Sequence, residues 1–161
     1  CASWMNQYGT PIKIVRPFHT YGPGINFDDG RVFADFVADV VVGRNIKMKS
    51  DGSAIRAFCY IADATVGFFT VLLKGDTGQA YNVGNDKDVI SILELAHMLV
   101  NLFPDKKLNV ETDIKALNVN DGYLQSNLVC ICPNISKLRK IGWKPHFSLE
   151  EGFNRTIESF L

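Results

Sequence analysis

The sequence predicts an α/β protein, because short apolar runs typical of strands alternate with longer segments of helical periodicity. Residues 12–15 form a short apolar, β-branched run that predicts a strand, and residues 79–84 predict another strand. Between them, residues 32–41 repeat apolar side chains at helical spacing and are followed by Gly43. A third sign is Ser91-Ile-Leu-Glu94, a capping box that satisfies two backbone amides at the start of a helix.

The first residues read as the end of a helix. Trp4, Met5 and Tyr8 recur at helical spacing, and Gly9 supplies the stop. Residue 1 is Cys, and no capping residue or first helical turn precedes this pattern. We therefore expect the chain to be a piece of a longer protein.

The rest of the chain continues the alternation. In order, the patterns predict a strand at 46–49, a turn at 51–52, a strand at 55–61, a short and mostly buried helix from Asp63 to Gly75, a strand at 108–112, a helix at 133–141 and a terminal helix after a second capping box at Ser148. Within 55–61 the alternation puts Arg56, Phe58 and Tyr60 on one face.

The composition excludes several classes of partner. Lys plus Arg and Asp plus Glu each number 17 among 161 residues, so net charge gives no bulk attraction to nucleic acid or an anionic membrane. No apolar run is long enough to span a bilayer, and nothing at the start resembles a signal peptide. The four cysteines lack the C-x-x-C spacing of zinc and redox sites. We expect no nucleic acid or membrane partner, and a reducing cytoplasmic location.

Few motifs that carry chemistry are present. The sequence has no G-x-G-x-x-G, G-x-x-x-x-G-K-[ST], G-x-S-x-G or H-E-x-x-H. Its histidines, at 19, 97 and 146, are scattered, so we expect no metal site. His19 differs from the others because it follows the strand at 12–15, at the end of a strand where ligands bind in open α/β sheets. A loop histidine bonded to backbone is an equal alternative.

Arg56 is the second candidate. An arginine beside aromatic residues can hold a phosphate through two hydrogen bonds and offer a flat surface to a base. From the residues alone we favour the alternative, an edge-strand arginine paired with an aspartate. Asp63 is most simply a helix cap.

Four blocks of the sequence carry a family resemblance. They are Arg16-Pro-Phe-His-Thr-Tyr-Gly-Pro-Gly24; Asp51-Gly-Ser-Ala-Ile-Arg-Ala-Phe-Cys-Tyr-Ile-Ala-Asp63; Tyr81-Asn-Val-Gly84 with Ser91-Ile-Leu-Glu94; and Ser136-Lys-Leu-Arg-Lys-Ile-Gly-Trp-Lys-Pro145 with Ser148-Leu-Glu-Glu-Gly152. In this order, they resemble the carboxyl-terminal half of an extended short-chain dehydrogenase/reductase. That group comprises the NAD(P)-dependent nucleotide-sugar epimerases, 4,6-dehydratases and decarboxylases.

The resemblance implies a fold and an incomplete enzyme. Residues 1–161 would be the substrate-binding carboxyl-terminal portion, with strands that belong to a Rossmann-type sheet whose dinucleotide-binding half is absent. Residues 1–24 and 79–104 would pack on that missing half. The family's glycine-rich turn and its catalytic Tyr-x-x-x-Lys do not occur in this sequence. The resemblance therefore implies no catalytic residue in this chain.

The resemblance also assigns site residues. Pro17 and Phe18 would lie beside the nicotinamide, mainly through their backbone. His19 stands where relatives place an asparagine that contacts the sugar diphosphate. Arg56 resembles the arginine that grips this diphosphate, which favours a functional role for it. The other substrate-binding candidates are Val32, Phe33, Phe36, Met48, Lys49 and Tyr123.

The implied parent protein is a cytoplasmic enzyme that oxidises a nucleotide-sugar transiently, with NAD or NADP as cofactor. Epimerase, dehydratase and decarboxylase are equal alternatives, and a homodimer is expected. This chain alone would neither bind the cofactor tightly nor turn over substrate. A rival interpretation is a non-catalytic sugar-nucleotide binding or regulatory protein on the same scaffold. A third is a remnant without an independent role.

Overall fold

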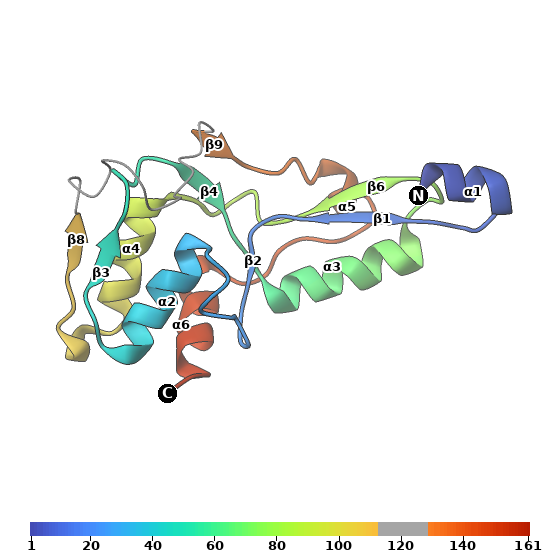
Figure 1. The fold of residues 1–161 in the computed structure, drawn as a ribbon. Helices are drawn as coiled ribbons and strands as arrows, with labels where there is room; N and C mark the ends of the chain where they lie inside the picture. The colour runs from blue at the N-terminus through green and yellow to red at the C-terminus, as the bar shows by residue number, and fades with distance from the viewer. Residues whose placement is uncertain (113–128) are drawn as a thin grey trace.

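The computed structural model describes residues 1–112 and 129–161, and its elements form two regions side by side (Figure 1). The three-helix region comprises α2 (Val32–Val42), β3 (Ile46–Met48), α4 (Ile92–Leu102), β8 (Val110–Thr112) and α6 (Leu149–Glu158). The strand-pair region comprises α1 (Ala2–Tyr8), β1 (Ile14–Pro17), α3 (Ile61–Lys74), β6 (Ala80–Val83) and α5 (Ser136–Lys140). The predicted α/β class is confirmed.

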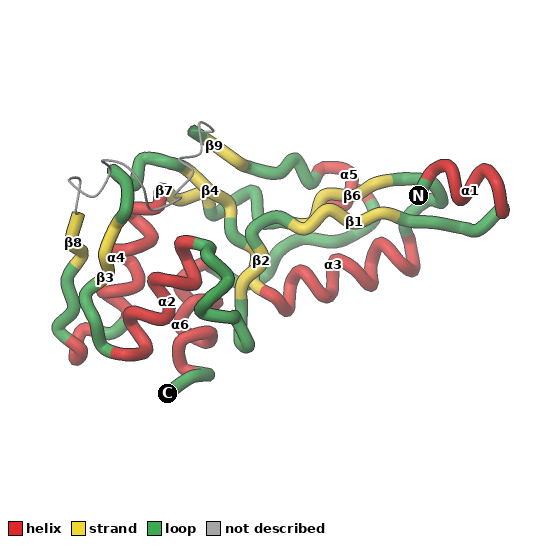
Figure 2. The backbone as a smooth tube through the Cα atoms, viewed as in Figure 1, coloured by secondary structure: helices red, strands yellow, loops and turns green. Residues whose placement is uncertain are grey.

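Short strands lie where the two regions meet (Figure 2). They are β2 (Thr20–Tyr21), β4 (Ile55–Ala57), β5 (Cys59–Tyr60), β7 (Val89–Ser91) and β9 (Cys130–Ile131); a short 3-10 helix, η1 (Pro104–Lys106), follows α4. The pairs β1–β6, β2–β5 and β3–β8 are all parallel. β4 is the central strand of a three-stranded sheet, antiparallel to β7 and parallel to β9. Parallel pairing needs long crossover connections, which the helices supply.

The three-helix region encloses its own apolar core. α4 contacts both α2 and α6, and inward side chains such as Val37 and Leu99 are fully buried. The capping box predicted for α4 is confirmed: Ser91 Oγ accepts from the Glu94 N–H at 3.1 Å, and Glu94 Oε2 accepts from the Ser91 N–H at 2.9 Å. At α6 only the serine half of the second predicted box forms, through Ser148 Oγ and the Glu151 N–H.

The strand-pair region is covered less completely. The helix predicted to start at Asp63 instead runs from Ile61 for 14 residues, and the prediction that it is mostly buried is wrong. Its inner face packs Ala64 and Val71 against a small core with β6 residues. Its outer face carries large apolar side chains that are between 56% and 76% exposed, namely Val66, Phe69, Leu72 and Leu73.

The single strand predicted over 55–61 is two strands, β4 and β5, separated at Phe58. The chain changes sheets at this point, because β4 pairs with β7 and β9 whereas β5 pairs with β2. Every residue from 56 to 60 is buried. The alternating side chains of residues 56–60 therefore point to two faces that are both packed, and neither face is exposed to solvent.

Asp63 joins the two regions. The prediction that it caps α3 is wrong, because the N-cap residue is Tyr60 and no side chain caps the helix. The Asp63 carboxylate instead accepts hydrogen bonds from the N–H groups of His146 and Phe147, at 2.9 and 3.0 Å. Its carbonyl oxygen accepts from Trp143 Nε1 at 3.1 Å. This buried carboxylate thus fixes the segment that leads into α6.

Candidate functional site

A cavity of about 260 Å³ opens between the loop before α2, the first turns of α2 and the end of β3. Val32 and Phe36 line it from the helix, and Met48 and Lys49 line it from the strand side. Asp35 lies between the two helical residues and pairs with Lys49 at 3.4 Å. The remaining lining residues are Phe27, Asp28, Gly30, Lys47, Ser50 and Ile92. Apolar walls with a few charged groups are typical of a small-molecule site.

Gly52 positions the β3 side of this cavity. Its φ is +72°, and a Cβ atom there would lie 2.2 Å from Met48 Cε and 2.8 Å from Leu93 Cβ. The Leu93 N–H donates to the Gly52 carbonyl at 3.0 Å. Only glycine fits this turn, and its absence of a side chain lets Met48 pack closely beside the start of α4.

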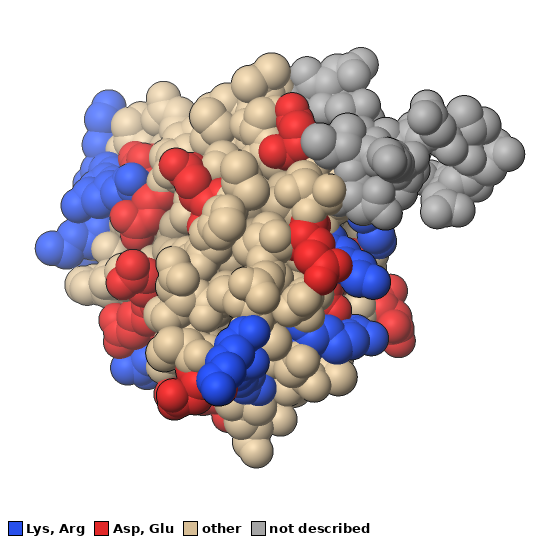
Figure 3. Space-filling model, turned by 90° about the vertical axis from the view of Figure 1, so that its left-hand side faces the viewer, with Lys and Arg blue, Asp and Glu red and all other residues tan. Residues whose placement is uncertain are grey.

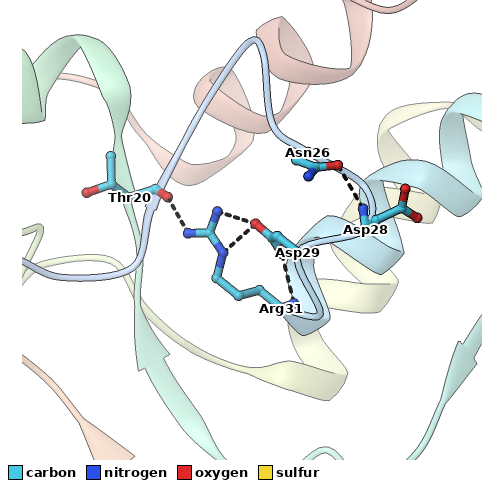
Figure 4. A network of polar contacts seen from close by, with 5 residues as sticks. All are labelled: Thr20, Asn26, Asp28, Asp29 and Arg31. Atoms are coloured by element: carbon cyan, nitrogen blue, oxygen red, sulfur yellow. Dashed lines mark hydrogen bonds and ion pairs between the residues drawn. The ribbon is translucent and has the colours of Figure 1, made fainter.

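Arg31 organises the loop before α2. Figure 4 shows its guanidinium between the Asp29 carboxylate and the Thr20 carbonyl. Arg31 Nε donates to Asp29 Oδ2 at 2.6 Å, and Nη1 donates to the Thr20 carbonyl at 3.3 Å. The hydrogen bond from Arg31 lowers the pKa of Asp29. Asn26 Oδ1 accepts from the Asp28 N–H at 3.1 Å in the same loop. These contacts tie β2 to the entrance of the cavity.

His19 adopts a strained backbone conformation at the end of β1. Its φ is +32°, a region that costs a residue with a side chain about 1–2 kcal/mol. Its ring lies 5.6 Å from the Phe58 ring, and its carbonyl accepts from the Cys59 N–H at 3.1 Å. Nδ1 of His19 and Oγ1 of Thr20 are buried without a hydrogen-bond partner. Neighbouring unsatisfied groups of this kind are unusual in folded proteins and mark a candidate ligand site.

The pKa of His19 is lowered from its ordinary value. Burial is the largest cause, and the charge of Arg56 is the next. A backbone hydrogen bond at Ala57 acts in the opposite direction, while the charge of Arg31 adds to the lowering. The imidazole is therefore neutral at neutral pH.

Arg56 lies close to His19 on β4. Arg56 is only 8% exposed, and its Nη1 donates a hydrogen bond to the Ile55 carbonyl at 2.8 Å. The prediction of an edge-strand position is wrong, because β4 lies between β7 and β9. A buried guanidinium on a central strand presents a rigidly placed charge.

The predicted substrate-binding residues separate into two neighbouring groups. Val32, Phe36, Met48 and Lys49 line the cavity, whereas His19 and Arg56 lie outside its lining. Phe33 is buried and does not line the cavity. Its ring lies 5.5 Å from that of Phe58, and the Arg31 guanidinium lies 4.7 Å from its ring centre. Phe33 thus packs between the two groups, and Tyr123 lies outside the described residues.

The sequence analysis did not identify Asp35, Lys47 or Arg31 as site residues. Asp35 could have been found, because it falls three residues after Val32 on the same helical face. Arg31 could have been inferred only as part of the Asp28-Asp29-Gly-Arg31 turn. Its contact with Thr20 joins segments 11 residues apart and depends on the loop conformation.

Two further polar groups, Cys59 and Tyr21, are buried in the part of the chain that the structure describes. Burial raises the pKa of the Cys59 thiol to about 12 and strongly raises that of Tyr21, so neither group ionises at neutral pH. Within residues 1–112 and 129–161, no three His, Cys, Asp or Glu residues gather as metal ligands. None of the helices in these same ranges has the length and apolar character to cross a membrane. Figure 3 shows basic and acidic side chains interspersed on the face that it draws.

Comparison with known proteins supplies independent information. A sequence profile described as "NAD dependent epimerase/dehydratase family" matches residues 1–84. UDP-glucuronic acid decarboxylase 3 of Arabidopsis thaliana is 35% identical over 156 residues, which are 96% of this chain and 42% of that protein. The dTDP-D-glucose 4,6-dehydratase of Mus musculus is 30% identical over 156 residues, 97% of this chain and 42% of that protein. The chain thus spans about two fifths of the length of these relatives.

A solved structure agrees with the fold. The UDP-glucuronic acid 4-epimerase of Bacillus cereus, in complex with UDP-glucuronic acid and NAD, superposes with a TM-score of 0.80 at 24% identity. The match covers 99% of this chain and 48% of the epimerase. The parallel strand pairs and their crossover helices therefore share the fold of about half of that epimerase. From its sequence match and its fold, the chain belongs to the NAD-dependent epimerase/dehydratase family.

Proposed function

We propose that this chain is the substrate-binding half of an NAD(P)-dependent nucleotide-sugar epimerase, dehydratase or decarboxylase. The observation that carries the proposal is that the charge of the buried Arg56 acts on His19, in a molecule that also has a cavity lined by α2 and β3. A diphosphate needs fixed positive charge and hydrogen-bonding groups, and a base needs a flat apolar slot. Similarity to a decarboxylase and a dehydratase supports the reaction class without separating its members.

In this proposal the two groups of residues bind different parts of the substrate. His19 and Arg56 hold the diphosphate, and Phe33 positions His19 through the Phe58 ring. The base enters the cavity, where Val32, Phe36 and Met48 supply apolar contacts and Lys49 supplies an exposed charge. Tyr123 remains a candidate for a further phosphate contact.

The cofactor site is proposed to be shared with a segment outside this chain. Pro17 is exposed at the carboxyl end of β1, as a nicotinamide contact requires, and Phe18 follows it. The Phe18 N–H already donates to the Val83 carbonyl at 2.9 Å, and the sequence has no glycine-rich turn to hold the pyrophosphate. NAD would supply the hydride acceptor. The chain's own residues fit only the nicotinamide end, so we expect no tight NAD binding and no turnover by the chain alone.

The strand-pair region is the proposed contact with an amino-terminal Rossmann half. Among the described residues β1 has one partner, β6, so its other edge is available for a further strand. An open groove of about 550 Å³ runs between the β1 side and α3, lined by Pro11, Ile12, Lys13, Val15, Phe68, Val71 and Leu72. Helix α4 is already packed against α2 and α6, so the proposal is restricted to residues 1–24, β6 and α3. The whole protein is proposed to be a cytoplasmic homodimer, and four free cysteines are consistent with a reducing compartment.

Substitution of Arg56 tests this function. Titration of UDP-glucose into the chain, followed calorimetrically, should show at least a tenfold loss of affinity in Arg56→Ala, because one charge-assisted grip on the diphosphate is worth about 1.5–3 kcal/mol. Arg44→Ala is the matched control: Arg44 pairs with Asp39 at 3.0 Å, is largely exposed and does not line the cavity.

Two results would contradict the proposal. If Arg56→Ala and the unsubstituted chain bind UDP-glucose with equal affinity, Arg56 is not part of the site. If the folded, unsubstituted chain binds no nucleotide-sugar, the proposed function is wrong. The same substitution can be tested in a protein that includes the amino-terminal half. If that protein binds and turns over a nucleotide-sugar and Arg56→Ala loses both properties, the enzyme interpretation is supported. If the unsubstituted protein with both halves binds a nucleotide-sugar without turning it over, the non-catalytic interpretation is favoured.

A further inference from the structure

We propose that His19 takes up a proton when a nucleotide-sugar diphosphate binds, so that binding strengthens as the pH falls from 8 to 6. The inference rests on the proposed function, because it concerns the same anion site. It adds a property that neither the family nor the fold specifies, namely that substrate affinity is coupled to the protonation of one side chain.

The first observation is the unsatisfied ring nitrogen. Nδ1 of His19 is buried and has no hydrogen-bond partner, although a buried polar atom normally has one. The backbone φ of His19 is also +32°, a value that residues other than glycine rarely adopt. The Phe58 ring, at 5.6 Å, restricts the imidazole further. The ring is thus held in place with one hydrogen-bonding position unused.

The second observation is the set of charges around the ring. Arg56 faces it from β4, and Arg31 faces it from the loop before α2. Asp29 binds Arg31 through its carboxylate, so part of that charge is already balanced. Tyr21 and Cys59, on the neighbouring strands β2 and β5, are uncharged because burial raises their pKa values. Without ligand, burial together with the charges of Arg56 and Arg31 therefore keeps His19 neutral.

A diphosphate reverses this balance. Its two negative charges offset the arginines, which removes the charge repulsion that adds to burial in opposing an imidazolium. Protonation then makes both ring nitrogens donors, and Nδ1–H can donate to a phosphate oxygen in a charge-assisted hydrogen bond. The proton comes from solvent, and no covalent bond changes.

The sign of the pH dependence follows. The pKa of His19 is below its ordinary value in the free chain and rises in the complex, so the complex binds more protons than the free chain. Affinity therefore increases as the pH falls through this interval, by at most about tenfold per pH unit for one proton. At a pH well above the His19 pKa of both the free chain and the complex, His19 is neutral in both states and affinity no longer depends on its protonation.

The experiment measures proton uptake directly. UDP-glucose is a suitable probe because its diphosphate is esterified at both ends and lacks the phosphate ionisation that a free terminal phosphate has near pH 6. Calorimetric titration of the chain at pH 6, 7 and 8, in two buffers of different ionisation enthalpy, should show uptake of a fraction of a proton. Affinity should increase about three- to tenfold from pH 8 to pH 6.

Two variants separate His19 from other histidines. His19→Asn keeps a hydrogen-bonding side chain but cannot titrate, so its affinity should be independent of pH. His97→Asn is the control, since His97 is exposed on α4, and it should retain the pH dependence of the parent. In the parent itself, nuclear magnetic resonance should show a higher His19 pKa with UDP-glucose than without it, a measurement that does not depend on a variant folding.

The outcomes are distinct. An unchanged His19 pKa on binding, or a pH dependence retained in folded His19→Asn, overturns this inference. If UDP-glucose binding is meanwhile sensitive to Arg56→Ala, the proposed function stands. If the folded parent does not bind UDP-glucose at any pH, both fail together.

Discussion

The three-helix region and the strand-pair region use similar elements but complete their packing to different degrees. In the first, three helices and a strand pair enclose aromatic and aliphatic residues from α2, α4 and α6. In the second, a smaller cluster lies under β1, β6 and α3, and the outer face of α3 exposes several large apolar side chains. An apolar helix face of this kind normally marks a surface that another element covers. The self-sufficient part of the fold is therefore the three-helix region, which contains the candidate cavity.

The largest expected effect that tests this comparison is the loss of Phe153. It is fully buried on α6, and its ring stacks on Tyr21 at 3.9 Å. Phe153→Ala should lower the free energy of unfolding by about 3–5 kcal/mol, because it removes an aromatic ring and leaves a cavity.

Phe69→Ala on the outer face of α3 is the matched control, since Phe69 is 59% exposed. It should change stability by less than about 0.5 kcal/mol, as surface substitutions do. Denaturant unfolding measures both. A cost at Phe69 as large as that at Phe153 would mean that the α3 face is covered in the chain itself.

A smaller effect is expected where the two regions are joined. Asp63→Ala removes the acceptor of two backbone N–H groups at 2.9 and 3.0 Å. Leaving these donors unsatisfied should cost about 2–3 kcal/mol. Asp63→Asn keeps one acceptor oxygen and should cost less, and hydrogen exchange at His146 and Phe147 should quicken in the alanine variant. If hydrogen exchange at His146 and Phe147 is unaltered in Asp63→Ala, Asp63 does not position the segment that leads into α6.

The smallest effect on stability, and the most informative about the open face, concerns α3 alone. The double variant Phe69→Ser and Leu73→Ser should leave the free energy of unfolding within about 0.5 kcal/mol, because both side chains are exposed. It should, however, reduce binding of an apolar dye and concentration-dependent association, measured by fluorescence and by sedimentation. Full retention of both would argue against an uncovered interaction surface on α3.

Local signals in the sequence predicted most of the elements. The serine–glutamate pair at 91 and 94 predicted a helix start because a capping box depends on residues three apart. Gly9 and Gly43 predicted helix ends, and both adopt the left-handed conformation that favours glycine. The family resemblance depended on such local runs, and the four blocks together were enough to indicate it.

The errors share a physical origin. Asp63 has the composition of a cap, yet its partners at 146 and 147 lie more than 80 residues away. The strand at 55–61 is divided because its two halves pair with different sheets. The apolar residues of α3 predicted burial, since a periodic pattern cannot state whether a covering element is present.

The candidate site divides in the same way. Residue types drew attention to His19 and Arg56, but for Arg56 only the family resemblance favoured a functional role. Only the tertiary structure brought them together, left Nδ1 of His19 without a partner and aligned Arg31 with them. The sequence by itself thus determined which groups could bind an anion. The fold decided the charge state of His19, because its burial and its distances from charged groups arise only when β1, β4 and the loop before α2 are packed together.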